Sequence, residues 1–263
     1  MNFSKLSEKF RRIGEYRKFY HLMGPTFCWK KITKNNAVLE CQFHGRSFKI
    51  RPCDSDIEVL LKIFIDREYD LESLRCWDQL KSIYQGRING GVYPLIIDLG
   101  ANIGASAIFF SEMFPQSDII AIEPDTDNFA LLSHNVRDMG RIAPIQAAIG
   151  SEPGFVTLTP GKASWGVTTV RSEAGFPVVT IDDIRQMRPG ANVFIVKIDI
   201  EGFEKDLFST NTAWLDDVDI LIIEPHDWLL QGQRTSRNFQ REMGARDFDL
   251  LIQGENLIYV RAR

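Results

Sequence analysis

A glycine-containing turn at residues 98–104 constrains the fold of this chain more than any other segment. An apolar run from Tyr93 to Ile97 leads into the turn, and a segment of helical character leaves it. Strand, glycine-rich turn and helix, in this order, make room for a nucleotide-like ligand. Gly100 and Gly104 lack a Cβ atom, so the turn can be tight and a ligand can approach the main chain. The segment therefore predicts a cofactor site at the end of a buried strand.

Two acidic residues end successive apolar runs. Asp98 places a carboxylate at the carboxyl end of the first run, which suits a ligand with a positive charge. Glu123 follows the next run, residues 119–122, and lies 25 positions after Asp98. This spacing is close to the offset of roughly 20 residues at which an acid binds ribose hydroxyls. We expect both acids to contact the cofactor.

From residue 94 onward, strand-like and helix-like segments alternate. The predicted strands are residues 94–99, 118–123, 142–149, 193–199 and 218–224, and the predicted helices are residues 103–113, 126–138, 202–209 and 233–245. Such alternation is typical of a parallel sheet with helices on both faces. Residues 248–253 and 257–261 flank a turn and predict an antiparallel hairpin that closes the sheet.

Two regions depart from this alternation. Residues 150–192 contain only short strand-like pieces, at 155–159 and 178–180, and an excursion of this length usually shapes a site. Residues 1–75 predict a separate extension or cap, which precedes a catalytic domain at residues 76–263.

The extension is expected to consist of a helix, a hairpin and a second helix. Residues 3–20 predict a basic amphipathic helix, which we expect to pack on its own domain or on a second subunit, with an anionic membrane surface as the alternative. Residues 37–41 and 46–51 predict a hairpin, and residues 57–65 predict a helix.

Composition excludes several classes of protein. The formal charge of −4 argues against nucleic acid as the main partner, because nucleic-acid-binding proteins usually carry a strongly basic face. No run approaches the roughly 20 apolar residues of a membrane span, and the first residues lack the apolar core of a signal peptide, so we expect a cytoplasmic protein. The four cysteines form no C-x-x-C pair and predict neither a disulfide framework nor a zinc site.

Charged residues gather at the ends of two neighbouring predicted strands. Lys197, Asp199 and Glu201 end one strand, and Glu224 and His226 end the next. A single right-handed crossover tends to place such strands side by side, about 4.8 Å apart. Because ligands of open parallel sheets bind at the carboxyl ends of the strands, we expect these residues to lie beside whatever Asp98 and Glu123 bind.

Four segments together resemble the FkbM family of S-adenosylmethionine-dependent methyltransferases. They are Asp98–Gly104, Ile122–Pro124, Thr180–Ile184 and Lys197–Glu204, and the resemblance covers roughly residues 60–263. It implies an α/β class I methyltransferase fold, a Rossmann-like and mostly parallel seven-stranded sheet with a reversed last strand. It also implies methylation of a hydroxyl on a sugar, glycan or secondary metabolite. The cofactor-binding residues that it implies are Asp98, Gly100, Ala101, Asn102, Gly104, Glu123, Pro124, Ala147 and Asp199.

Methyl transfer from a sulfonium needs an aligned acceptor oxygen and a group that takes its proton. His226 is the first choice for this base, because its unperturbed pKa of about 6.5 would leave it mostly neutral in the cytosol, and Asp199 is the second. Alternatively, Asp199, Glu224 and His226 hold a divalent ion such as Mg²⁺ that lowers the pKa of the hydroxyl.

Several of these residues also have purely structural interpretations. Glu201 can be an acid favoured by a helix N-terminus, and Lys197 can pair with a carboxylate at the strand end. Asp182 and Asp183 are expected to cap a short helix. The aromatic residues Tyr69 and Trp165 are more often core residues than ligand-stacking ones.

Two other functional classes compete with a methyltransferase. A dinucleotide-dependent oxidoreductase would need G-x-G-x-x-G, but Asn102 and Ala105 occupy the positions of the second and third glycines. A non-catalytic protein that keeps the cofactor fold is the other alternative. The intact cluster of charged residues at the two strand ends argues against it.

Overall fold

The computed structural model describes residues 25–160 and 167–262. The chain divides into two compact units, residues 1–65 and 66–263, and each is described by itself. This division follows Ile65, whereas the sequence places the end of the extension at residue 75. The helix predicted over residues 3–20 and the side chain of Trp165 lie outside the described residues.

The first unit contains the predicted hairpin. Strands β1 (Leu39–Phe43) and β2 (Arg46–Ile50) pair in antiparallel fashion. His44 and Gly45 join them with φ angles of 50° and 76°, as a tight hairpin turn with two left-handed residues requires. Residues 25–32 are helical, and the helix predicted over 57–65 is α2 (Asp56–Leu60) continued by the π-helical turn η1 (Leu61–Ile65).

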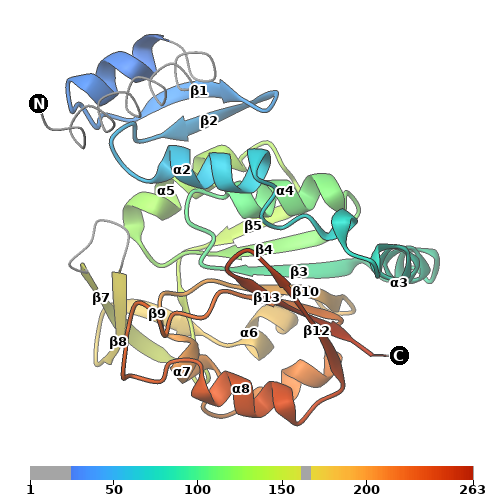
Figure 1. The fold of residues 1–263 in the computed structure, drawn as a ribbon. Coiled ribbons are helices and arrows are strands. Elements are labelled where there is room, and N and C mark those ends of the chain that lie inside the picture. The colour runs from blue at the N-terminus through green and yellow to red at the C-terminus, as the bar shows by residue number, and fades with distance from the viewer. Residues whose placement is uncertain (1–24, 161–166, 263) are drawn as a thin grey trace, which may run out of the picture. The chain divides into compact units, whose positions relative to one another are not determined.

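The second unit is built on a seven-stranded sheet with the order β12-β13-β11-β10-β3-β4-β5 (Figure 1). The strands are β3 (Pro94–Leu99), β4 (Asp118–Ile122), β5 (Ile142–Ile145), β10 (Asn192–Ile198), β11 (Ile220–Ile223), β12 (Phe248–Gln253) and β13 (Asn256–Arg261). β13 runs antiparallel to both of its neighbours, and the strands from β11 to β5 are parallel to one another. The reversed last strand of the predicted fold class is confirmed.

Helices cover both faces of this sheet (Figure 1). One face carries α3 (Trp77–Asn89), α4 (Ala105–Met113) and α5 (Thr126–Asn135), and the other carries α6 (Ile181–Gln186), α7 (Glu204–Leu207) and α8 (Arg237–Gly244). The short 3₁₀ turns η2 (Leu71–Ser73) and η3 (Thr212–Asp217) complete the unit. Alternate residues of each strand point to opposite faces, so Leu95, Ile97 and Leu99 join the core beneath α6 to α8.

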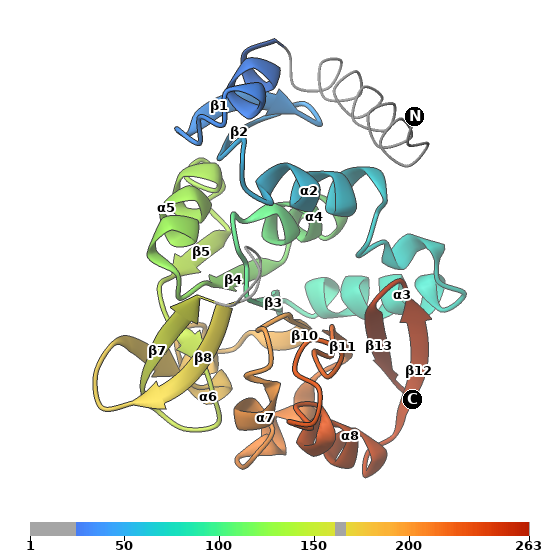
Figure 2. The same cartoon turned by 60° about the vertical axis from the view of Figure 1, so that its left-hand side comes forward.

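The segment between residues 148 and 179 forms a second sheet with the order β6-β9-β7-β8 (Figure 2). Its strands are β6 (Ala148–Ile149), β7 (Gly154–Pro160), β8 (Val167–Ser172) and β9 (Phe176–Val179). The prediction of one strand over residues 142–149 is therefore wrong. β5 ends at Ile145, and the chain then crosses to pair Ala148 and Ile149 with Val178 and Val179.

Within the described part of the chain, none of the helices combines the length and the apolar character that crossing a membrane requires.

Candidate active site

The carboxyl ends of the parallel strands meet at one edge of the large sheet. The backbone N–H groups of Gly100, Asp199 and Glu224 donate to the last residues of neighbouring strands, at 3.0 to 3.1 Å, which fixes the loops that follow. A pocket opens at this edge. Its lining includes the predicted cofactor residues Gly100, Asn102, Glu123, Pro124, Ala147 and Asp199, together with Glu201.

The turn after β3 requires glycine at two positions. Gly100 has a φ of 76°, and a Cβ atom there would lie 1.8 Å from the carbonyl oxygen of Asp199. Gly104 has a φ of 89° at the start of α4, and its Cβ would lie 2.8 Å from Cδ1 of Leu132. Between them Ala101 is buried and its N–H donates to the carbonyl of Ile122. The turn after β3 thus passes so close to the end of β10 that there is no room for a side chain at Gly100.

Glu123 is buried at the end of β4 and faces this turn. Its carboxylate accepts hydrogen bonds from the backbone N–H groups of Asn102, at 2.9 Å, and Asp125, at 3.0 Å. Burial raises the pKa of Glu123 to about 7, although these hydrogen bonds act in the opposite direction. Asn102 has a left-handed φ of 49°, which aims its N–H at the carboxylate. A hydrogen bond therefore holds Glu123 against the turn that follows β3.

Asp98 lies beneath the pocket rather than in its lining. It is fully buried, accepts a hydrogen bond from Oγ of Ser106 at 2.6 Å, and pairs with Nζ of Lys197 at 3.2 Å. Asp98 and Lys197 are neighbours across the β3–β10 ladder, which brings the two charges together. Lys197 therefore supplies a positive charge to Asp98, the role that the sequence argument assigned to a ligand.

Lys197 also links two parts of the site. Its ammonium donates to the carbonyl of Gly100 at 2.8 Å and lies 3.7 Å from the carboxylate of Asp199. Burial alone lowers the pKa of Lys197, but the charges of Asp98 and Asp199 outweigh it and raise this pKa. The pairing interpretation of Lys197 therefore matches its geometry.

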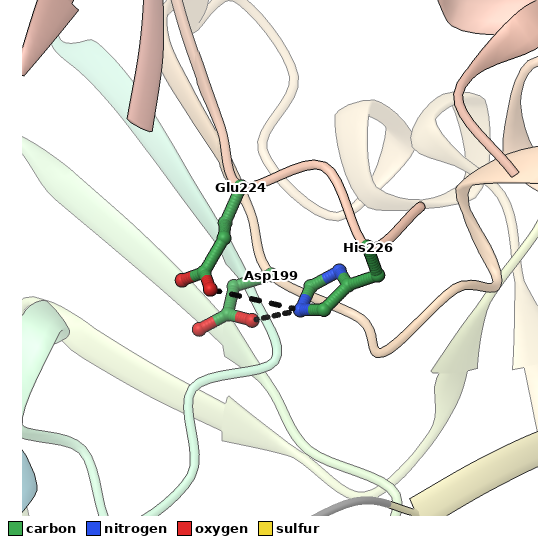
Figure 3. A group of neighbouring side chains, drawn as sticks. All are labelled: Asp199, Glu224 and His226. Atoms are coloured by element: carbon green, nitrogen blue, oxygen red, sulfur yellow. Dashed lines mark ion pairs between the residues drawn. The ribbon is translucent and has the colours of Figure 1, made fainter. Parts of the chain in front are cut away.

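Asp199, Glu224 and His226 converge at the ends of β10 and β11 (Figure 3). Nε2 of His226 lies 3.5 Å from Asp199 and 4.0 Å from Glu224. One ligand atom from each of the three residues lies within 4.8 Å of the others, a spacing that a single metal ion can bridge. The structure thus brings together the three residues that the sequence analysis grouped as a candidate ion site.

Sequence reasoning missed Glu204 as a partner of His226. Glu204, the first residue of α7, is buried and lies 2.8 Å from Nδ1 of His226. The two residues are 22 positions apart, so only the packing of the β11–α8 loop on α7 reveals the contact. The repeated acids at 201 and 204 were the available signal.

The acids around His226 change its ionisation. Burial alone lowers the pKa of His226, but the hydrogen bond to Glu204 and the charges of Glu204, Asp199 and Glu201 raise it to about 9. Contrary to the predicted neutral imidazole, His226 therefore favours its protonated form, because four carboxylates surround it. This site holds an excess of negative charge, which favours a cationic ligand.

Glu201 lies in the turn before α7 with a left-handed φ of 55°. The helix begins at Glu204, not at residue 202 as predicted, so Glu201 is outside its first turn. Burial and the charge of Asp199 raise the pKa of Glu201 to about 7. A strained backbone that directs an acid into a pocket is a frequent feature of functional sites.

The remaining candidates have structural roles. Thr180 caps α6, where its hydroxyl accepts from the N–H of Asp183 and the carboxylate of Asp183 accepts from the N–H of Thr180. Asp182 lies 3.5 Å from Arg185. Tyr69 is buried, with Nζ of Lys197 5.9 Å from its ring centre, and does not line the pocket.

Residues 98–250, more than half of the chain, match the methyltransferase FkbM domain. The chain belongs to the FkbM methyltransferase family. This match begins at Asp98 and spans the glycine turn, the acid cluster and strands β4, β10 and β11.

Individual relatives share smaller parts of this FkbM chain. The hexuronic acid methyltransferase AglP of Haloferax volcanii is 29% identical over 133 residues, which are 49% of this chain and 54% of AglP. Methyltransferase sdnD of Sordaria araneosa is 32% identical over 69 residues, 25% of this chain and 27% of sdnD. The chain thus spans about half the length of AglP and less of sdnD. A methyltransferase structure from Geobacter sulfurreducens has a TM-score of 0.38 at 15% identity, covering 80% and 90% of the two chains.

Proposed function

We propose that this chain transfers a methyl group from S-adenosylmethionine to a hydroxyl of a sugar or glycan in the cytoplasm. The observation that carries the proposal is a single pocket lined by Gly100, Glu123, Ala147 and Asp199 at the carboxyl edge of the sheet. FkbM family membership supports the reaction, and the action of AglP on a hexuronic acid supports a sugar acceptor.

The cofactor is assigned to the side of the pocket formed by β3, β4 and β5. Glu123 would bind the ribose hydroxyls, Pro124 and Ala147 would flank the base, and the turn from Gly100 to Gly104, of which Gly100 and Asn102 line the pocket, would surround the methionine moiety. Asp98 supports this turn indirectly, since it neutralises the lysine that holds the carbonyl of Gly100. The acids around His226 favour the positive sulfonium.

The acceptor hydroxyl is assigned to the side of the pocket formed by Asp199 and Glu201, with Nε2 of the buried His226 3.5 Å from Asp199. In the reaction the acceptor oxygen bonds to the methyl carbon, the carbon–sulfur bond breaks, and the hydroxyl proton goes to a base. His226 remains the first choice for this base, with Asp199 second. A bound sulfonium would bring positive charge to this end of the pocket and would lower the pKa of the His226 imidazole from about 9.

A divalent ion such as Mg²⁺ is the alternative to His226 as the group that activates the acceptor hydroxyl, since His226 would then be a ligand and not the base. Asp199, Glu224 and His226 supply two hard carboxylates and one imidazole within bridging distance. Such an ion would lower the pKa of the acceptor hydroxyl. Methyl transfer that survives dialysis against EDTA assigns the proton to a protein base alone. Activity lost in EDTA and recovered with Mg²⁺ assigns these three residues as ligands.

Calorimetry separates the proposed function from the oxidoreductase alternative. We expect S-adenosylhomocysteine to bind and NADH to give no heat of binding, because the turn lacks the second and third glycines of a dinucleotide site. Tight binding of NADH without binding of S-adenosylhomocysteine would overturn the proposal. Transfer of labelled methyl groups to hexuronic acids and neutral hexoses then tests for turnover, whose absence would indicate a non-catalytic protein.

A further inference from the structure

A basic cavity lies between α7, α8 and the loop that precedes α8. Four of its seven lining residues are cationic and none is acidic; the cations are Lys205, Arg234, Arg237 and Arg241. Its volume is about 630 Å³, within the range of roughly 300 to 1,000 Å³ that is typical of sites for small ligands. The cavity is therefore large enough for a sugar unit.

Three of these positive charges lack a carboxylate partner. Arg241 pairs with Glu242 at 3.1 Å, but within residues 25–160 and 167–262 no acid lies within ion-pair distance of Lys205, Arg234 or Arg237. Elsewhere in the same unit arginines have close partners, such as Asp206 with Arg171 at 2.6 Å. In a chain of net charge −4, this concentration of cations favours an anionic ligand.

The chain connects the candidate active site with the basic cavity through one loop and one turn. The loop that carries Arg234 and leads into α8 starts at His226, and its Leu230 packs on Gly202, where an added Cβ would lie 2.2 Å from Cδ1 of Leu230. Asn238 of α8 donates to the carbonyl of Lys205 in α7 at 2.9 Å. Both views show α7 and α8 side by side (Figures 1 and 2). One turn and one loop thus connect the acid cluster with the cations.

We propose that the basic cavity binds the anionic group of an acidic sugar acceptor, a carboxylate or a phosphate, while the hydroxyl to be methylated reaches the pocket. This inference rests on the proposed function, since it assigns an acceptor class to the same enzyme. The carboxylates around His226 repel an anionic acceptor, so its acidic group needs a separate cationic site. Guanidinium groups suit this role because they bind carboxylate and phosphate with paired hydrogen bonds.

Calorimetry at low ionic strength tests the inference on the full chain. The probes are trigalacturonic acid, glucose 1-phosphate and the neutral trisaccharide maltotriose. The double variant Arg234→Glu/Arg237→Glu reverses two charges of the cavity. The matched control Arg75→Glu/Lys81→Glu changes the net charge equally at exposed positions of the same unit.

We expect trigalacturonic acid, glucose 1-phosphate or both to bind the unmodified chain. The cavity variant should weaken this binding at least tenfold and the control less than twofold. Whichever acid binds identifies carboxylate or phosphate as the recognised group. The inference would be overturned if both variants bound the acids with equal affinity, or if maltotriose bound the unmodified chain as tightly as the acids.

Binding of S-adenosylhomocysteine is measured in the same samples and separates the two proposals. Unchanged affinity for it shows that the variants fold. If acid binding depends on the cavity but S-adenosylhomocysteine does not bind the unmodified chain, the anionic site stands and the methyltransferase proposal fails. If S-adenosylhomocysteine binds and the acids do not, only the inference about the acceptor fails.

Discussion

At the scale of single residues, Glu123 shows the conflict between stability and function most directly. Its pKa rises from 4.5 to about 7 on folding, so the folded chain holds the proton more tightly than the unfolded chain. The free energy of unfolding therefore falls as pH rises between these values. Above pH 7 the buried carboxylate destabilises the fold by about 3 kcal/mol, while the proposed ribose contact needs its charged form.

The substitution Glu123→Gln should separate these effects. Because glutamine stays neutral, we expect the variant to lose about 1 to 3 kcal/mol less stability than the unmodified chain between pH 5 and pH 8, although its amide group replaces one of the two oxygens that accept backbone N–H groups. Its affinity for S-adenosylhomocysteine should fall at least tenfold at pH 8. Urea denaturation and calorimetry at both pH values measure this. A variant destabilised equally at both pH values would contradict the assigned ionisation.

His226 provides the second prediction at this scale. His226→Ala should reduce methyl transfer by roughly 10²- to 10⁴-fold, because it removes the proposed base. Affinity for S-adenosylhomocysteine should change little, since His226 does not line the cofactor pocket. His134→Ala, at another histidine outside that pocket, is the matched control. Parallel loss of binding and turnover in His226→Ala would argue for a structural role instead.

The residues of the site also mark what a sequence can foretell. The glycines and acids at strand ends were predictable, because strand order and turn chemistry place them at one edge. A carboxylate partner for Lys197 was also predictable, but its identity as Asp98 was not, since it depends on the exact register that sets Lys197 opposite Asp98. The ionisation of His226 was also out of reach, because it arises from Glu204, brought near only by tertiary packing.

At the scale of elements, the turn between β3 and α4 packs its main chain directly against the residue that follows β10. Gly100 lies against the carbonyl group of Asp199 there. We predict that Gly100→Ala destabilises the fold by about 3 kcal/mol or more, because its Cβ would overlap the main-chain oxygen of Asp199, which cannot rotate away. Gly140→Ala is the control, with no atom within 4 Å of the added Cβ. Urea denaturation should place it within about 1 kcal/mol of the unmodified chain. Similar losses in both variants would refute this argument.

Sequence periodicity located most elements but not their ends. The apolar runs gave β3, β4, β10 and β11 to within two residues. The prediction of one strand over residues 142–149 was wrong because apolar residues lie on both sides of Gln146. The first half of the segment pairs with β4 and the second half with β9. Periodicity reports burial, and both halves of that segment are buried or half-buried.

At the scale of the whole molecule, ligand binding should appear as stability. With S-adenosylhomocysteine at about 100 times its Kd, we expect the free energy of unfolding to rise by about 2.7 kcal/mol. The Tm should then rise by roughly 5 to 10 °C. Thermal denaturation monitored by circular dichroism measures this shift, and NADH at equal concentration serves as the control. An equal rise in Tm with S-adenosylhomocysteine and NADH would indicate a site that does not discriminate between them.

The insertion of β13 between β11 and β12 has a consequence for biosynthesis. β11 consists of four buried aliphatic residues, and one of its edges is covered by β13, which the ribosome makes more than thirty residues later. Until then that edge exposes unpaired amide and carbonyl groups on a hydrophobic strand. Such an edge can pair with other nascent chains. Completion of the sheet must therefore await the emergence of β13, and chaperone protection of the β11 edge during translation would favour a soluble yield.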